Sequence, residues 1–208
     1  MMKSIKEKLL KFPSYSSELG LNLKRPEDRF KWFLSSIRYA KRISSEIAKK
    51  TYRMFEEEGL LTIEAIINAG WDKLVEVLDS GGYVRYDFST ASKLLEIAKT
   101  LKKKYSSLEN LYSQARDDSD LEKKLIEFKG VGPTTVNIFL RELRPIWEKA
   151  NPEPSNLALK VGKKLSLDKK EITYLESSLL RLSLEFCKKK RCSDCIVRDF
   201  CSEFKEAL

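Results

Sequence analysis

Residues 125–143 read LIEFKGVGPTTVNIFLREL and carry the clearest structural pattern in the chain. Apolar residues continue to Phe128, and the turn Gly130-Val131-Gly132 follows. Pro133 suits the first position of a helix, because its missing N–H would have no intrahelical acceptor there. Beyond it, apolar residues recur at helical spacing: Val136, Phe139, Leu140 and Leu143. The stretch therefore predicts two helices joined by a tight glycine turn.

This turn also predicts a place where an anion can dock. Its two glycines allow positive φ and let another molecule approach the backbone closely. The N–H groups at the start of the second helix point outward with the positive end of the helix dipole, which favours a phosphate. An ordinary tight turn between two core helices is the structural alternative at this point.

All four cysteines lie at the end of the chain, separated by four, two and five residues: Cys187, Cys192, Cys195 and Cys201. Four thiolates within so short a segment can close one tetrahedral metal cage. Two disulfides are the weaker interpretation, because disulfides belong to oxidising compartments and the rest of the chain is typical of an intracellular protein. The spacing alone leaves zinc and a [4Fe–4S] cluster as alternatives.

Together, the hairpin and the cysteine loop resemble the endonuclease III-like DNA glycosylases, a helix-hairpin-helix superfamily of base excision repair. The pattern Phe-Lys-Gly-Val-Gly-Pro-x-Thr is similar to that family's hairpin. A [4Fe–4S] loop with gaps of six, two and five residues closes the family's chains. Here the first gap is two residues shorter, so the loop must be tighter. The resemblance covers residues 28 to 204 and implies a structural [4Fe–4S] cluster, with zinc as the alternative.

The resemblance implies an all-α fold of two helical lobes. Residues 28–145 would form a barrel lobe carrying the helix-hairpin-helix, at about 121–143. Residues 1–27 and 146–208 would form the second lobe with the cluster loop, 187–201. The low content of glycine and proline, with long Lys/Glu/Leu-rich stretches, independently predicts a mostly helical protein.

Helix boundaries can be placed within these lobes. The long apolar pattern from Asp28 predicts a break around residues 39–44, and Gly70 is expected to separate two short helices. Asp168 is expected to cap one long final helix that extends to Phe186, with Glu171 as its capping-box partner.

Composition limits the possible functions. Forty Lys and Arg residues against 31 Asp and Glu give a net charge of +9, which favours polyanions such as duplex DNA. The absence of histidine excludes Ser-His-Asp and Cys-His catalysis and histidine-containing zinc sites. Without a membrane-length apolar run or a signal-peptide core, the chain is expected to be a soluble, cytoplasmic monomer.

The catalytic positions implied by the resemblance depart from the family. Its bifunctional members use a lysine just after the turn, and Thr134 stands there, lining the expected pocket; threonine cannot form a Schiff base. Ser155 stands where the family has an aspartate. Glu153 is the nearest carboxylate and is the tentative substitute, with a solvated loop residue as the stronger alternative.

DNA contacts are expected from three places. The glycine turn and its flanks form the first. The loop 81–86, at the family's wedge position, offers Tyr83 or Tyr86 for stacking on a base, unless these rings pack on neighbouring helices. The basic run 188–191 could face phosphates or simply be solvated. The expected contact residues are Lys129, Gly130, Val131, Gly132, Thr134, Thr135, Tyr83, Arg85, Lys188, Lys189, Lys190 and Arg191. Ile37 stands where the family has a space-filling glutamine, so that role is not carried over.

Three functions compete on these observations. The first is a monofunctional DNA glycosylase that flips a damaged or mispaired base out of duplex DNA and removes it with water. The second is a catalytically silent DNA-binding or damage-sensing protein on the same scaffold. The third is a zinc-stapled helical interaction module without a DNA role.

Overall fold

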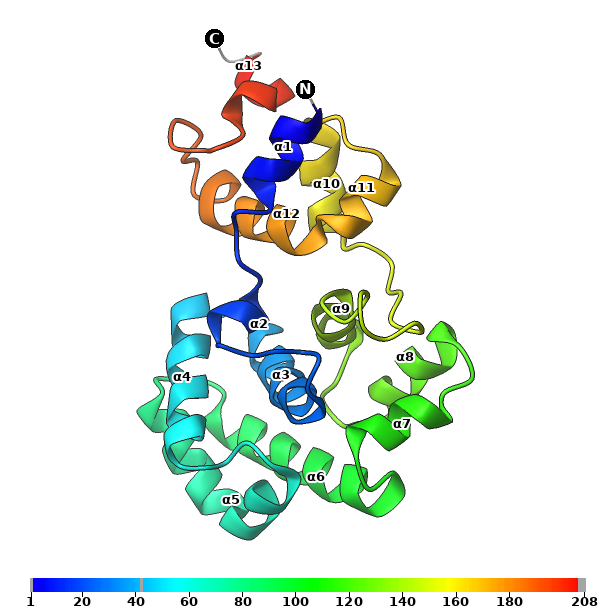
Figure 1. Cartoon of the computed structure of the whole chain (residues 1–208). Coiled ribbons are helices and arrows are strands. Elements are labelled where there is room, and N and C mark those ends of the chain that lie inside the picture. Colours follow the sequence, from blue (N-terminus) through cyan, green and yellow to red (C-terminus); the bar gives the residue numbers. More distant parts are fainter. Residues whose placement is uncertain (1, 42, 206–208) are drawn as a thin grey trace. The chain divides into compact units, whose positions relative to one another are not determined.

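A computed structural model describes residues 2–41 and 43–205, and every regular element in these ranges is a helix (Figure 1). This confirms the predicted all-α class. The chain divides into two compact units. Unit 1 consists of Met1–Glu18 and Glu153–Leu208, and unit 2 consists of Leu19–Pro152. Within the described ranges, no helix is both long and apolar enough to cross a membrane.

Unit 2 contains seven helices among its described residues: α3 (Pro26–Tyr39), α4 (Ser45–Glu57), α5 (Ile63–Ser80), α6 (Asp87–Lys104), α7 (Leu108–Gln114), α8 (Asp118–Ile126) and α9 (Pro133–Arg141). At its centre, the fully buried ring of Phe33 contacts the rings of Phe128 and Phe139, with centroids 6.0 and 5.1 Å away. The Trp32 indole N–H donates to the Phe139 carbonyl at 3.2 Å. Helix α3 therefore contacts Phe128, two residues before Gly130, and the helix that follows the turn.

Polar N-caps begin four of these helices. The side chains of Ser44, Thr62, Ser107 and Asp117 each accept a backbone N–H from the first turn of the helix that follows. The predicted break around residues 39–44 is confirmed, since α3 ends at Tyr39 and α4 begins at Ser45. The break at Gly70 is also confirmed, because φ there is +74°.

The segment before α3 packs into unit 2. Leu19, Leu21 and Leu23 are buried. The Arg29 guanidinium donates to the Leu23 carbonyl at 2.8 Å and forms a bidentate pair with Glu109 at 2.7 and 2.8 Å. These contacts join residues 19–25 to the lobe whose start was placed at residue 28 from the sequence.

Unit 1 is built from both ends of the chain. It contains α1 (Met2–Leu9), α2 (Tyr15–Glu18), α10 (Asn156–Lys164), α11 (Lys169–Tyr174), α12 (Glu176–Leu182), the π-helical turn η1 (Ser183–Cys187), the 3-10 turn η2 (Arg198–Phe200) and α13 (Ser202–Lys205). Leu9, Ala158, Val161 and Leu179 lie in its apolar core. A Cβ on Gly162 would come within 2.3 Å of the Ile172 side chain, so glycine permits the close packing of α10 on α11.

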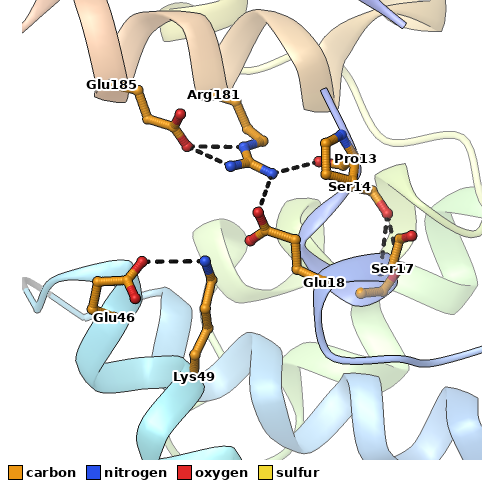
Figure 2. Close-up of polar contacts among 9 residues, drawn as sticks. Pro13, Ser14, Ser17, Glu18, Glu46, Lys49, Arg181 and Glu185 are labelled. Atoms are coloured by element: carbon orange, nitrogen blue, oxygen red, sulfur yellow. Dashed lines mark hydrogen bonds and ion pairs between the residues drawn. The ribbon is translucent and has the colours of Figure 1, made fainter. Parts of the chain in front are cut away.

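A buried arginine ties the N-terminal segment to α12 (Figure 2). The Arg181 guanidinium lies 2.6 Å from the Glu18 carboxylate and 2.7 Å from that of Glu185, and it donates to the Pro13 carbonyl at 2.7 Å. Burial opposes the charge of Arg181, but the hydrogen bonds to Glu185 and Glu18 outweigh it, so the arginine pKa is raised. These ion pairs are partly removed from water, and each partner is hydrogen-bonded. Removing one partner would therefore lower the stability of unit 1, because the other would keep a partly buried, unpaired charge.

The final long helix was predicted incorrectly. Asp168 and Glu171 do form the expected capping box. The helix that they start ends at Tyr174, however, because the backbone at Leu175 (φ −96°, ψ 10°) leaves helical geometry. A separate helix, α12, begins at Glu176 and turns this side chain into the core.

Candidate functional site

The glycine turn joins α8 to α9 as the sequence predicted. Pro133 occupies the first helical position and Gly132 the N-cap. Gly130 has φ +89°, a conformation that favours glycine. Gly132 is extended instead, with φ −111°, so only the first of the two glycines uses positive φ. The Val131 N–H donates to the Phe128 carbonyl at 3.0 Å and closes the turn.

The start of α9 leaves backbone donors available. Gly132 has no side chain to cap the helix, and the N–H of Val136 is the first to bond within it. The N–H groups of Thr134 and Thr135 precede that bond, as in any helix start. The Thr134 side chain is exposed, whereas Val131 and Thr135 are 4% and 3% exposed. The latter two residues can therefore reach a phosphate only through their backbone.

Three lysines gather beside this turn. A Cβ on Gly130 would meet the alkyl chain of Lys93 at 2.5 Å, so Lys93 lies directly under the turn. The pKa of Lys93 is lowered by partial burial and then by the positive charges of Lys41 and Lys129. Lys129 also lies 3.5 Å from the Glu96 carboxylate, an exposed pair of little strength. Sequence reasoning named Lys129 alone, because nothing in the linear pattern brings Lys41 and Lys93 to the hairpin.

Tyr83 does not have the role expected for it. Its side chain is 1% exposed, and burial raises its pKa to about 12. Its N–H donates to the Leu78 carbonyl at 2.9 Å, while Gly82, at φ +85°, donates to the Asp79 carbonyl. This is a Schellman end for α5, and the residue that follows its left-handed glycine usually packs back on the helix. Tyr83 is therefore a core residue, and Arg85 is the exposed member of the pair proposed for DNA.

The cysteines lie in and after η1, within unit 1. Cys187, Cys195 and Cys201 pack against the apolar core, and Cys192 is exposed. Burial raises the pKa of Cys187 and Cys195; at Cys187 the charge of Lys164 opposes this rise, and the charges of the other cysteines add to it. In the described ranges, no group of three or more metal-binding side chains is close enough to hold an ion. The donor set fits a four-thiolate centre in its chemistry, and the sulfurs would have to approach one another to close it.

The basic run 188–191 is exposed along its whole length. Arg191 pairs with Asp194 at 3.1 Å. Lys188 faces an open hollow of about 530 Å³, in which Lys164 pairs with Glu203 at 2.8 Å. The hollow is lined by Leu157, Lys160, Val161, Lys163, Lys164, Ser183, Cys187, Lys188 and Glu203. Unit 1 thus presents a second group of cations, with lysines of α10 beside the cysteine loop.

The residues considered for catalysis, Glu153 and Ser155, and their neighbour Glu176 differ strongly in solvent exposure. Glu153 is 79% exposed and pairs with Lys169 at 2.9 Å, as a solvated loop residue would. The Ser155 hydroxyl caps α10 by accepting the Ala158 N–H at 3.3 Å. The Ser155 N–H donates to the Glu176 carboxylate at 2.9 Å, and Glu176 is 1% exposed. Sequence reasoning did not single out Glu176, although it lies four residues after Ile172 and therefore on the apolar side of the expected helix.

The residues described above fall in both units. Thr134 and the three hairpin lysines belong to unit 2, whereas Ser155, Glu176 and the cysteines belong to unit 1. Comparison with protein-family models and with curated proteins found no match for this chain.

Proposed function

We propose that this protein binds duplex DNA and removes a damaged or mispaired base as a monofunctional DNA N-glycosylase of the endonuclease III-like helix-hairpin-helix superfamily. The observation that carries the proposal is the start of α9. It combines a glycine N-cap without a side-chain acceptor, two early backbone donors and three lysines around the turn. Such a helix start suits a phosphate group.

Water is the nucleophile in this proposal. The target base is turned out of the duplex, and its bond to the sugar is hydrolysed. A lysine at the position of Thr134 would form a Schiff base with the sugar, and threonine has no amine to do so. The reaction therefore ends at an abasic site with the strand intact. The exposed cations of the 188–191 run and of α10 support binding of the phosphate backbone.

A Thr134→Glu variant tests the hairpin. A carboxylate in the first turn stabilises a helix, so α9 should remain folded, but it repels a phosphate. We expect duplex binding to weaken by about tenfold, the loss of roughly one charge-assisted hydrogen bond. The slope of log Kd against log salt should also become shallower. Thr134→Gln is the matched neutral control and should bind like the wild type.

The same preparations are incubated with duplexes carrying uracil, a G·T mismatch, an oxidised guanine or an alkylated adenine, and then treated with alkali. Alkali-dependent strand cleavage identifies a monofunctional glycosylase. Salt-dependent binding without any cleavage would replace the enzyme with the catalytically silent DNA-binding alternative. Equal binding by Thr134→Glu and wild type would refute the role given to the hairpin.

We further propose that Cys187, Cys192, Cys195 and Cys201 hold a structural [4Fe–4S] cluster, with zinc as the alternative. Four filled ligand positions leave none for substrate, so the metal would stabilise the end of unit 1. Protein purified without oxygen should be brown, with a broad band at roughly 400 nm, and should contain iron.

Cys195→Ser should lose both the colour and the iron, and unit 1 should melt earlier. Ser193→Ala, in the same loop, is the control and should keep both. Colourless protein with one zinc per chain would favour zinc, and protein free of both metals would contradict the site.

A further inference from the structure

We propose that the hollow of unit 1 beside the cysteine loop binds a phosphate group of duplex DNA, and that Glu203 holds this place in the free protein. The inference rests on the proposed function and concerns how one of its contacts is regulated. Among the described residues that line the hollow, four of nine are lysines and Glu203 alone is acidic. An open space of about 530 Å³ with this excess of positive charge suits an anionic group.

Helix α10 supplies three of the four lysines from one face. Lys160, Lys163 and Lys164 follow the i, i+3 and i+4 spacing that makes side chains neighbours on a helix. Like charges at this spacing repel one another, so the arrangement gives the helix no stability of its own. The fourth lysine, Lys188, comes from the turn after η1 and faces the same hollow. Cations gathered from two separate segments favour a role in binding an anion.

Glu203 already places one anionic group in the hollow. Its carboxylate lies 2.8 Å from the Lys164 ammonium, and the two side chains are 64% and 30% exposed. A lysine donates to carboxylate and phosphate oxygens alike, so Glu203 occupies a position that a phosphate oxygen would take. An exposed ion pair contributes little stability, and the displaced carboxylate would return to water. Glu203 is therefore a built-in competitor of the phosphate for Lys164.

Glu203→Gln tests this competition. The amide keeps the size of the side chain but has no charge to hold Lys164 or to repel a phosphate. We expect the Kd for a short undamaged duplex to fall about threefold, the factor that an exposed ion pair contributes to an equilibrium. Anisotropy of a labelled duplex measures it, with full-length protein purified without oxygen. Glu64→Gln is the matched control and should bind like the wild type. Glu64 also lies in the first turn of its helix, is 61% exposed and pairs with Lys102, but it is outside the hollow.

Lys164→Gln tests the phosphate contact itself. We expect the Kd for the same duplex to rise about tenfold, the loss of roughly one charge-assisted hydrogen bond. The slope of log Kd against log salt should become shallower by about 0.9, because one phosphate fewer is neutralised. A lysine with a purely structural role would not change this slope. Lys102→Gln removes the lysine of the control pair and should leave both the Kd and the slope unchanged.

The outcomes distinguish this inference from the function on which it rests, because the duplex carries no lesion and no base has to be removed. Tighter binding by Glu203→Gln, with Glu64→Gln unchanged, supports the inference whether or not any lesion is cleaved. Equal tightening by both variants would trace the effect to net charge, and no tightening by either would make Glu203 an ordinary surface residue. Each of these two results overturns the inference and leaves the proposed function standing.

A calorimetric titration with inorganic pyrophosphate separates duplex DNA from a small phosphorylated ligand as the occupant. If Glu203→Gln binds pyrophosphate more tightly than the wild type but the duplex no better, the hollow serves a small ligand and the assignment to DNA is overturned. If neither the wild type nor any variant binds the duplex, the inference and the proposed function fail together.

Discussion

Replacement of Phe33 by alanine is expected to lower the free energy of unfolding of unit 2 by about 3–5 kcal/mol, the range for a fully buried phenylalanine. Its ring is 0% exposed and lies in edge contact with Phe128 and Phe139. The loss includes the transfer of the ring to water and the cavity that it leaves between α3 and the hairpin. Denaturant unfolding followed by tryptophan fluorescence measures it, because all three tryptophans, at positions 32, 71 and 147, belong to unit 2.

Two variants frame this result. In Phe33→Leu the leucine side chain fills much of the space of the ring. The free energy of unfolding should therefore fall by less than half of the decrease expected for Phe33→Ala. Ile126→Ala removes an apolar side chain that is 43% exposed at the end of α8, and it should change the unfolding midpoint only slightly. If Phe33→Ala unfolded at the same denaturant concentration as Ile126→Ala, Phe33 would not be the packing centre of unit 2.

Replacement of Arg181 by methionine should destabilise unit 1 by about 3–5 kcal/mol, the cost of breaking a buried ion pair by removing one partner. The methionine would leave Glu18 and Glu185 without the guanidinium that lies 2.6 and 2.7 Å from them. The Pro13 carbonyl would lose its donor as well. Since unit 1 contains no tryptophan, hydrogen–deuterium exchange of amides in residues 14–18 and in α12 is the appropriate measurement.

Arg198→Met is the matched control in the same unit. Arg198 is 47% exposed and lies 3.5 Å from Asp199, so its removal should leave exchange in α12 unchanged. Arg181→Lys keeps the positive charge but not the planar guanidinium. Its amide exchange in α12 should be faster than in Arg198→Met and slower than in Arg181→Met. Slow exchange in α12 of Arg181→Met would show that the apolar core alone holds residues 13–18 in place.

The elements that could be predicted from sequence are those whose cause is local. Pro133 at a helix start, the capping box of Asp168 and Glu171, and the kink at Gly70 each depend on a few neighbouring residues. Helical periodicity likewise predicted the buried face of α9, where Val136 and Leu140 are 2% and 0% exposed. These features follow from backbone sterics and side-chain spacing, which the order of residues contains directly.

The errors arise where tertiary packing overrides a local pattern. Tyr83 follows two glycines and resembles an exposed loop aromatic, yet the Schellman end of α5 turns its ring into the core. The final helical pattern is continuous in sequence, yet the helix ends before Leu175 and a separate helix begins at Glu176. Periodicity gives the face of a helix but not the point at which packing ends it.

The order of residues alone determined the all-α class, the glycine turn before α9 and the proposal that four neighbouring cysteines share one metal. Only the tertiary structure brought Lys41 and Lys93 to the turn, separated exposed Glu153 from buried Glu176, and placed the Arg181 network. The physical reason is the distance along the chain between the residues that interact. Turns, caps and amphipathic faces are decided within a few residues, whereas burial and charge pairing depend on segments far apart in the chain that meet only in the folded protein.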